Sequence, residues 1–128
     1  MNPPILISNS FPFSLVRRHL TVEPRSIGDL QTALLKHPWV STWGHANTVL
    51  LASSLAGVNL RPKTERPALT LNESQFPQLD GQSFAECWLL TPDYVEPGFR
   101  PKIGEEVGAD KIRDWQILRL SWQTELSA

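Results

Sequence analysis

The sequence lacks most of the features that mark secreted and membrane proteins. Its single cysteine, Cys87, cannot form a disulfide within the chain and offers no zinc framework, so we expect a reducing compartment. The longest apolar run, residues 49–58, is interrupted by Ser53 and Ser54 and is shorter than the ~20 residues that a membrane span needs. The N-terminus has no basic start followed by an apolar core, as a secretory signal would have. We therefore expect a soluble, cytoplasmic protein with no membrane partner.

An excess of charge of one sign is also missing. The 128 residues include 12 Lys and Arg against 13 Asp and Glu, which gives a formal net charge of −1 at pH 7. A protein that holds duplex DNA by neutralising its phosphates needs an excess of positive charge, so duplex DNA is not an expected partner. A chain of this length is normally one domain, able to bury roughly two-thirds of the surface that its unfolded form exposes. We therefore expect one domain over residues 1–128.

Common catalytic motifs are absent as well. The sequence contains no Gly-x-x-x-x-Gly-Lys phosphate loop, no Gly-x-Ser-x-Gly nucleophile elbow and no His-Glu-x-x-His pair. His19, His37 and His45 have no Cys or His neighbour at the spacing of a metal-ligand pair. We therefore expect no dedicated metal site and no cofactor, although carboxylates could still recruit magnesium.

Eleven prolines and seven glycines divide the chain into short elements. Apolar runs and alternating patterns predict strands at residues 5–8, 20–22, 68–71, 84–90 and 118–123. Helical spacing of apolar residues predicts helices at residues 27–37 and 45–56, and we expect a short helix at residues 109–114. A polar loop should join the predicted strands at 68–71 and 84–90. A Pro- and Gly-rich loop should span residues 94–108. Strands and helices are intermixed, so we expect an α/β (α+β) fold: a single two-layer domain with helices packed on a mixed sheet.

Two of these helices carry boundary signals. Ser26 is typical of an N-cap and is followed three residues later by Asp29, while Pro38 should end the same helix. Gly57 occupies the position where a left-handed cap would end the next one.

The first candidate site is the segment Trp-Gly-His-Ala-Asn-Thr at residues 43–48, which opens a predicted helix. The first turn of a helix exposes unsatisfied N–H groups and the positive end of the macrodipole, so it can hold an anion. Gly44 would let a phosphate approach the backbone, His45 would stand beside it, and Asn47 adds a small polar group. Alternatively, Gly44 is a turn residue, Asn47 is a local cap and His45 lies on the surface.

The second candidate site follows the first predicted strand. Asn9 and Ser10 stand where ligands commonly sit in α/β sheets, and their side chains can orient hydroxyls or base edges. The alternative is an ordinary turn that leaves the strand, with Phe11 and Phe13 in the core.

Several basic residues could contact phosphates, because the arginine fork matches phosphate oxygens; equally, they could form a solvated surface. They are Arg17, Arg18, Arg61, Lys63 and Arg66.

Taken together, these segments resemble a known family. Ser-Asn-Ser-Phe at residues 8–11, Trp-Gly-His-Ala-Asn-Thr-Val at 43–49 and Ser-Leu-Ala-Gly at 54–57 are similar to motifs of the small ring nucleases of type III CRISPR antagonism. Members of that family occur in archaeal viruses, phages and host CRISPR genes. They show an Asn-Ala-Phe-like motif after the first strand, an Ile-Gly-His-Asp-Ser-Thr-like motif at a helix start, and Leu-Cys-Gly at the end of that helix. The resemblance covers roughly the first 70 residues and, more loosely, the closing elements.

The resemblance implies roles for particular residues. His45 matches the family's catalytic histidine, and Asn9 matches its ligand-binding asparagine. Arg66 aligns with a phosphate-contacting arginine when two extra residues fall in the preceding loop, and Glu96 loosely matches a glutamate of a Glu-Glu-Gly stretch. The family's arginine before that glutamate is missing, and Arg100 is a candidate to replace it. The histidine is followed by Ala-Asn rather than Asp-Ser, so its supporting contacts should differ from those of the family.

By resemblance, the chain would be a nuclease of antiviral defence that cuts the second messenger cyclic tetra-adenylate into linear di-adenylates. Attack by the ribose 2′-OH would leave a 2′,3′-cyclic phosphate, without metal, and would switch off type III CRISPR signalling. A virus-encoded copy would then work in the host cytoplasm. Both the family's dimers and the symmetry of the ring imply a C2 homodimer. Two other interpretations stay open: a non-catalytic sponge or sensor of cyclic oligoadenylate, and a protein-interaction domain of a mobile element.

Overall fold

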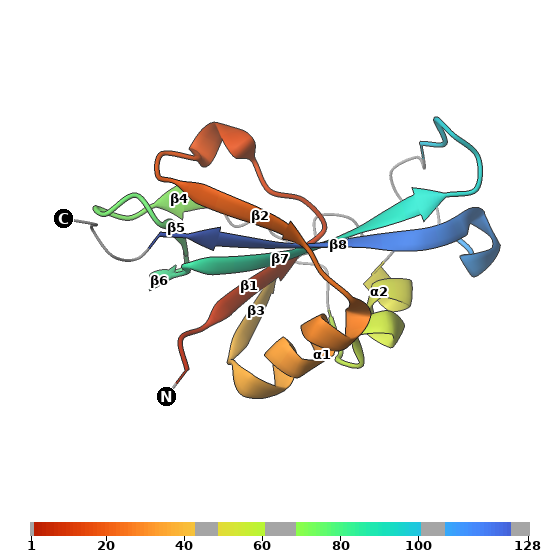
Figure 1. Cartoon of the computed structure of the whole chain (residues 1–128), viewed down its shortest axis with the longest axis horizontal. Coiled ribbons are helices and arrows are strands. Elements are labelled where there is room, and N and C mark those ends of the chain that lie inside the picture. The colour runs from red at the N-terminus through yellow and green to blue at the C-terminus, as the bar shows by residue number, and fades with distance from the viewer. Residues whose placement is uncertain (1, 43–48, 61–68, 101–106, 124–128) are drawn as a thin grey trace.

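The computed structural model describes residues 2–42, 49–60, 69–100 and 107–123. A five-stranded sheet in the order β2-β8-β7-β1-β3 forms its centre (Figure 1). The strands are β1 (Ile5–Ser8), β2 (Leu20–Pro24), β3 (Trp39–Thr42), β7 (Glu86–Tyr94) and β8 (Ile112–Trp122). β1 runs parallel to both β3 and β7, whereas β8 runs antiparallel to β2 and β7. The predicted α+β fold with a mixed sheet is therefore confirmed.

Two helices lie on one face of this sheet, α1 (Ile27–Lys36) and α2 (Val49–Ala56) (Figure 1). The N-terminus of α1 is a capping box: Ser26 Oγ accepts a hydrogen bond from the Asp29 backbone N–H at 3.1 Å, and the Asp29 carboxylate accepts one from the Ser26 N–H at 3.2 Å. Gly57 has a φ of 76°, which confirms the left-handed end predicted for the second helix.

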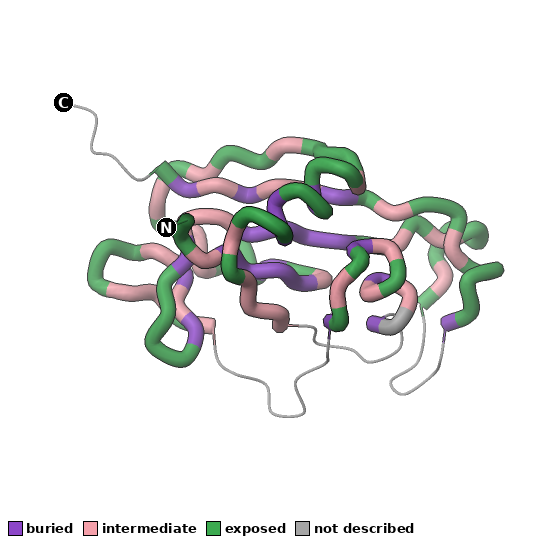
Figure 2. The backbone as a smooth tube through the Cα atoms, turned by 90° about the horizontal axis from the view of Figure 1, so that it is seen from below, coloured by how far each residue is buried: buried purple, intermediate pink, exposed green. Residues whose placement is uncertain are grey.

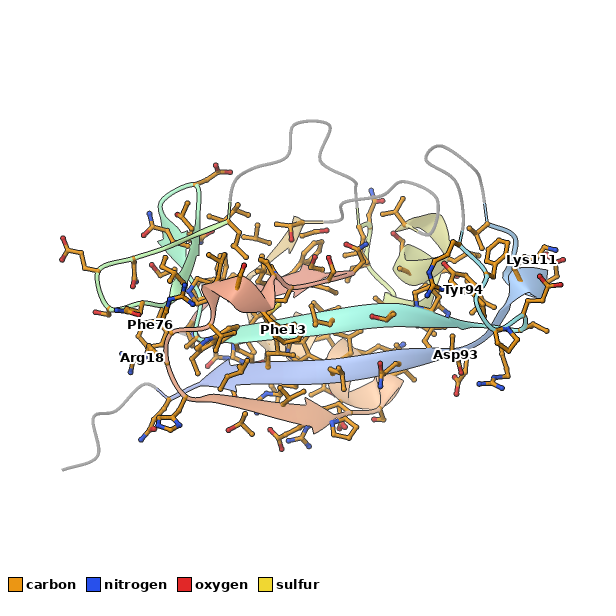
Figure 3. The ribbon with its side chains drawn as sticks, turned by 90° about the horizontal axis from the view of Figure 1, so that it is seen from above. Phe13, Arg18, Phe76, Asp93, Tyr94 and Lys111 are labelled. Atoms are coloured by element: carbon orange, nitrogen blue, oxygen red, sulfur yellow. The ribbon has the colours of Figure 1, made fainter. Side chains whose placement is uncertain are left out.

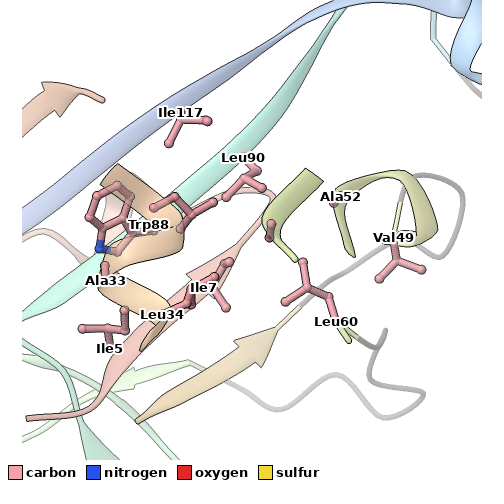
Figure 4. Close-up of a cluster of buried hydrophobic side chains, with 12 residues drawn as sticks. Ile5, Ile7, Ala33, Leu34, Val49, Ala52, Leu60, Trp88, Leu90 and Ile117 are labelled. Carbon is pink, nitrogen blue, oxygen red and sulfur yellow. The ribbon is translucent and has the colours of Figure 1, made fainter. Parts of the chain in front are cut away.

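Side chains between the helices and the sheet form the larger apolar cluster (Figure 4). Leu30 and Leu34 of α1 and Ala52 of α2 meet Trp88 and Leu90 of the central strand, and all five are buried. The apolar face of each helix thus packs against the apolar side chains that alternate along β7, and together they form one core.

A second cluster covers part of the opposite face. It joins Leu6, Cys87, Leu89 and Leu120 of the large sheet to Phe84 and its neighbours. A small sheet lies over it, made of β4 (Thr70–Leu71), β5 (Pro77–Leu79) and β6 (Gln82–Ser83). The buried residues consequently run along the central strands, with exposed segments around them (Figure 2). Burial raises the pKa of the Cys87 thiol far above its usual range, with a further contribution from Glu86, so the side chain is a packing residue.

Four expectations need correction or extension. The segment predicted to be a polar loop after β4 contains a β-hairpin of two short strands, β5 and β6, and both Asp80 and Gly81 in its turn have positive φ. Residues 109–114 are not one helix, because a three-residue 3-10 turn, Ala109–Lys111, leads directly into β8. β3 was not predicted at all. Phe11 is buried, but Phe13, in the short 3-10 turn Phe13–Leu15, is 62% exposed rather than in the core.

In the part of the chain that the structure describes, no helix is long and apolar enough to span a bilayer.

Charged side chains are linked across the helix-bearing face of β8. The Glu86 carboxylate accepts hydrogen bonds from Arg119 Nη2 at 2.8 Å and from Trp88 Nε1 at 2.6 Å, and Arg119 Nη1 donates to Glu23 at 3.1 Å. Partial burial of Glu86 raises its pKa, but the hydrogen bonds from Arg119 and Trp88 outweigh that effect, so the net pKa is lowered.

A pKa that is lower in the folded state adds stability above the unfolded pKa, and that stability is lost as the pH falls through the folded value. We therefore expect Glu86→Gln to reduce the free energy of unfolding by about 1–2 kcal/mol at neutral pH, after allowance for solvent screening. The difference from the wild type should shrink below about pH 4. Urea unfolding of the variant and the wild type at neutral pH and below about pH 4 measures this difference in stability. Glu73→Gln, at an exposed position, is the matched control. A pH-independent difference would contradict the assignment.

Candidate functional site

The carboxyl ends of β1 and β3 lie side by side, because Ser8 and Thr42 are register partners in parallel strands. A buried side chain joins them: Ser8 is 3% exposed, and its Oγ donates a hydrogen bond to the Thr42 carbonyl oxygen at 2.8 Å. The same Oγ accepts a longer bond, 3.4 Å, from the Ser10 backbone N–H. This clamp fixes the turn that carries Asn9 and Ser10 against the end of the neighbouring strand.

Further polar groups gather at the same edge of the sheet. Thr91 of β7 donates from its Oγ1 to the Asn9 carbonyl oxygen at 3.4 Å, which ties a third strand to the turn. Ser41 Oγ of β3 is buried and has no hydrogen-bond partner among the described residues. Parallel strands of α/β sheets place ligands at their carboxyl ends, so this edge is a candidate binding site of hydroxyl and amide groups.

The remaining predicted site residues of the described chain lie elsewhere. Glu96 and Arg100 are exposed and belong to the loop beyond β7, where the Phe99 N–H donates to the Glu96 carbonyl oxygen and Arg100 Nη1 donates to the Phe99 carbonyl oxygen. At about 3.3 Å per strand residue, roughly 10 Å separates Thr91, beside Asn9, from the end of β7 at Tyr94, before this loop begins. The loop that carries Glu96 and Arg100 therefore begins beyond a strand end that lies roughly 10 Å along β7 from the residue that contacts Asn9.

Gly44, His45 and Asn47 fall in residues 43–48, and Arg66 falls in residues 61–68, both outside the described residues. Their predicted roles stay predictions. In the described ranges, no three His, Cys, Asp or Glu side chains gather in a group that could hold a metal ion.

A pocket of about 540 Å³ opens where β2 leaves the sheet beside β7 and β8. Residues 24–25, 91–93 and 114–117 line it. The two long strands extend as an arm past the rest of the sheet, and Asp93, Tyr94 and Lys111 lie together near its end (Figure 3). Because Thr91 both lines the pocket and contacts the Asn9 carbonyl oxygen, the pocket borders the carboxyl edge of β1.

Ser8 belongs to the second candidate segment, but its hydrogen bond to Thr42 was not predicted from the sequence, and neither was this pocket. Ser8 ends an otherwise apolar strand, and a polar residue on a strand that is buried on both faces needs a partner, which was the available signal. The pocket combines segments that are far apart in the sequence, so no local pattern marks it.

Comparisons with known protein families and with curated proteins find no match to this chain. Among solved structures, the fold is similar to that of B116 of Sulfolobus turreted icosahedral virus, with a TM-score of 0.58. The two sequences are 15% identical, and the match covers 93% of this chain and 98% of the viral one. Nearly the whole chain therefore shares its fold with a small viral protein.

Proposed function

We propose that the chain is a metal-independent ring nuclease that cuts cyclic tetra-adenylate into two linear di-adenylates and so ends type III CRISPR signalling. The motif resemblance is the basis for this substrate. A viral protein with the same fold is compatible with a role against host defence, while its name states no activity.

One observation supports the proposal above the others: the hydrogen bond from Ser8 Oγ to the Thr42 carbonyl oxygen. It joins the two strand ends from which both motif segments leave, since Asn9 follows Ser8 and the segment containing His45 follows Thr42. The motifs were found separately in the sequence, 30 residues and more apart, and their starting points are neighbours in space.

The nucleophile of this reaction belongs to the substrate, so the protein needs only to position the ring and to donate a proton. The ribose 2′-oxygen bonds to the adjacent phosphorus, the bond from phosphorus to the 5′-oxygen breaks, and the 2′,3′-cyclic phosphate remains. His45 would donate the proton that the leaving 5′-oxygen needs, because only histidine titrates near neutral pH without a large perturbation. The proton of the attacking hydroxyl leaves to solvent, from which His45 is reprotonated. Asn9 would orient a ribose or base edge, and Arg66 would neutralise a phosphate.

Two equivalent cuts suit a symmetric enzyme. A C2 homodimer would present the same groups to both halves of the ring and supply one His45 from each chain. Glu96 and Arg100 lie on the loop beyond β7, and in such a dimer they would act from the loop of the second chain.

The proposal is tested by comparing cyclic tetra-adenylate with its fully 2′-O-methylated form, which has no nucleophile. We expect cleavage of the first and none of the second, with both raising the melting temperature of the protein. Cleavage of the methylated ring would contradict the 2′-OH mechanism, and failure of both rings to bind would contradict the substrate.

A further inference from the structure

The pocket beside the β7–β8 arm has polar side chains on one wall. Leu89 and Leu118 pack into the second core cluster, so alternation along each strand places Thr91, Asp93, Asp114 and Gln116 on that same face of the sheet. Thr91 pairs across the strands with Gln116, and Asp93 pairs with Asp114. All four are exposed, so they are accessible to a ligand.

Two groups of this wall have hydrogen-bonding capacity left, the Gln116 amide and one oxygen of Asp114. The Gln116 side-chain amide makes no hydrogen bond with the described residues. Asp114 Oδ1 accepts from the Trp115 backbone N–H at 2.8 Å, while its Oδ2 accepts none from the described chain. Asp93, by contrast, is paired with Arg113. Two carboxylates directly opposite each other on a sheet repel, and Arg113, whose pKa is raised chiefly by Asp93 and also by Asp114, offsets part of that repulsion.

The charge of the pocket decides what can enter it. Arg25 is paired with Glu23 at 2.9 Å, and Arg113 interacts with both Asp93 and Asp114, so these five charged groups leave one net negative charge beside the pocket. A phosphate would be repelled. A neutral ring that carries an amino group would be attracted, and apolar atoms of Pro24 and Pro92 complete the walls. The volume lies in the ordinary range for small-ligand sites.

We propose that this pocket binds the adenine base of an adenine nucleotide, and the choice of adenine rests on the proposed function. The exocyclic 6-amino group would donate to Asp114 Oδ2. The Gln116 amide would pair with a ring nitrogen, as glutamine does with adenine in nucleic acids. Because Thr91 connects the pocket to Asn9, a nucleotide held at the carboxyl edge of β1 can place a base here.

This assignment predicts discrimination at the 6-position of the purine. Hypoxanthine carries an oxygen there, which would face the Asp114 carboxylate with no proton between them. AMP and IMP share ribose and phosphate and differ at this group, so they are the matched probes. We expect AMP to bind the wild-type protein about tenfold more tightly than IMP, the loss of one specific base contact.

The decisive variant is Asp114→Asn, whose amide can donate to the 6-oxygen of IMP. It should abolish or reverse the preference for AMP, whereas Asp110→Asn, an equal charge change at an exposed position outside the pocket, should keep it. Dissociation constants come from NMR titration, followed at the Gln116 side-chain amide and the Trp115 indole. Unchanged preference in Asp114→Asn, or no shift of these signals with millimolar AMP, would overturn the proposal.

The same titration separates this inference from the proposed function. Cleavage of cyclic tetra-adenylate without AMP binding in the pocket would overturn the base site and leave the nuclease. AMP binding with the predicted preference, in a protein that leaves the ring intact, would support the base site and overturn the nuclease.

Discussion

His45→Ala is expected to slow cleavage of cyclic tetra-adenylate by about a hundredfold or more, because it removes the proposed general acid for the 5′-oxygen. Binding of the ring should change little, since the contacts assigned to Asn9 and Arg66 remain. The measurement is single-turnover cleavage together with the dissociation constant of the same variant.

The matched control for this variant is His19→Ala, because His19 is an exposed histidine immediately before β2. It should cleave at the wild-type rate. If His45→Ala also cleaved at that rate, His45 would not be the acid and the mechanism would be wrong. A loss of binding in parallel with the loss of cleavage would instead make His45 a ligand-binding residue.

Trp88→Ala is expected to have the largest effect on folding. Trp88 is 3% exposed in the middle of the helix-side cluster, and its Nε1 donates to the Glu86 carboxylate at 2.6 Å. Truncation leaves a large cavity and removes that bond, so the free energy of unfolding should fall by roughly 3–5 kcal/mol. Urea denaturation measures this.

Phe13→Ala provides the comparison, because Phe13 is a similarly large aromatic residue that is 62% exposed. Removing the Phe13 ring should change the free energy of unfolding by at most about 1 kcal/mol. Equal costs for the two truncations would mean that the cluster around Trp88 is not the core of the folded protein in solution.

Local patterns predicted much of the fold. The apolar run of β1, the Ser26 cap and the Gly57 ending depend on residues close in sequence, and the structure has all three. β3 was missed because four residues directly after Pro38 carry too short a pattern, and its pairing with β1 is a tertiary effect. The sequence predicts a helix over residues 109–114 where the structure has a 3-10 turn, because three residues are too few to show a helical period.

The site was less predictable than the fold. Asn9 and Ser10 could be singled out because a strand end is visible in sequence, and the structure places them at the carboxyl edge of the sheet. The clamp from Ser8 to Thr42 and the facing pair of Asp93 and Asp114 depend on strand register, which no single segment encodes.

Metal-independent cleavage of the ring is tested by incubating the purified protein with cyclic tetra-adenylate in excess EDTA and resolving the products by chromatography and mass. The proposed ring-nuclease mechanism predicts linear di-adenylate that ends in a 2′,3′-cyclic phosphate. An intact ring would contradict it. An accompanying rise in melting temperature would then indicate a sponge, and no rise would indicate a protein-interaction domain.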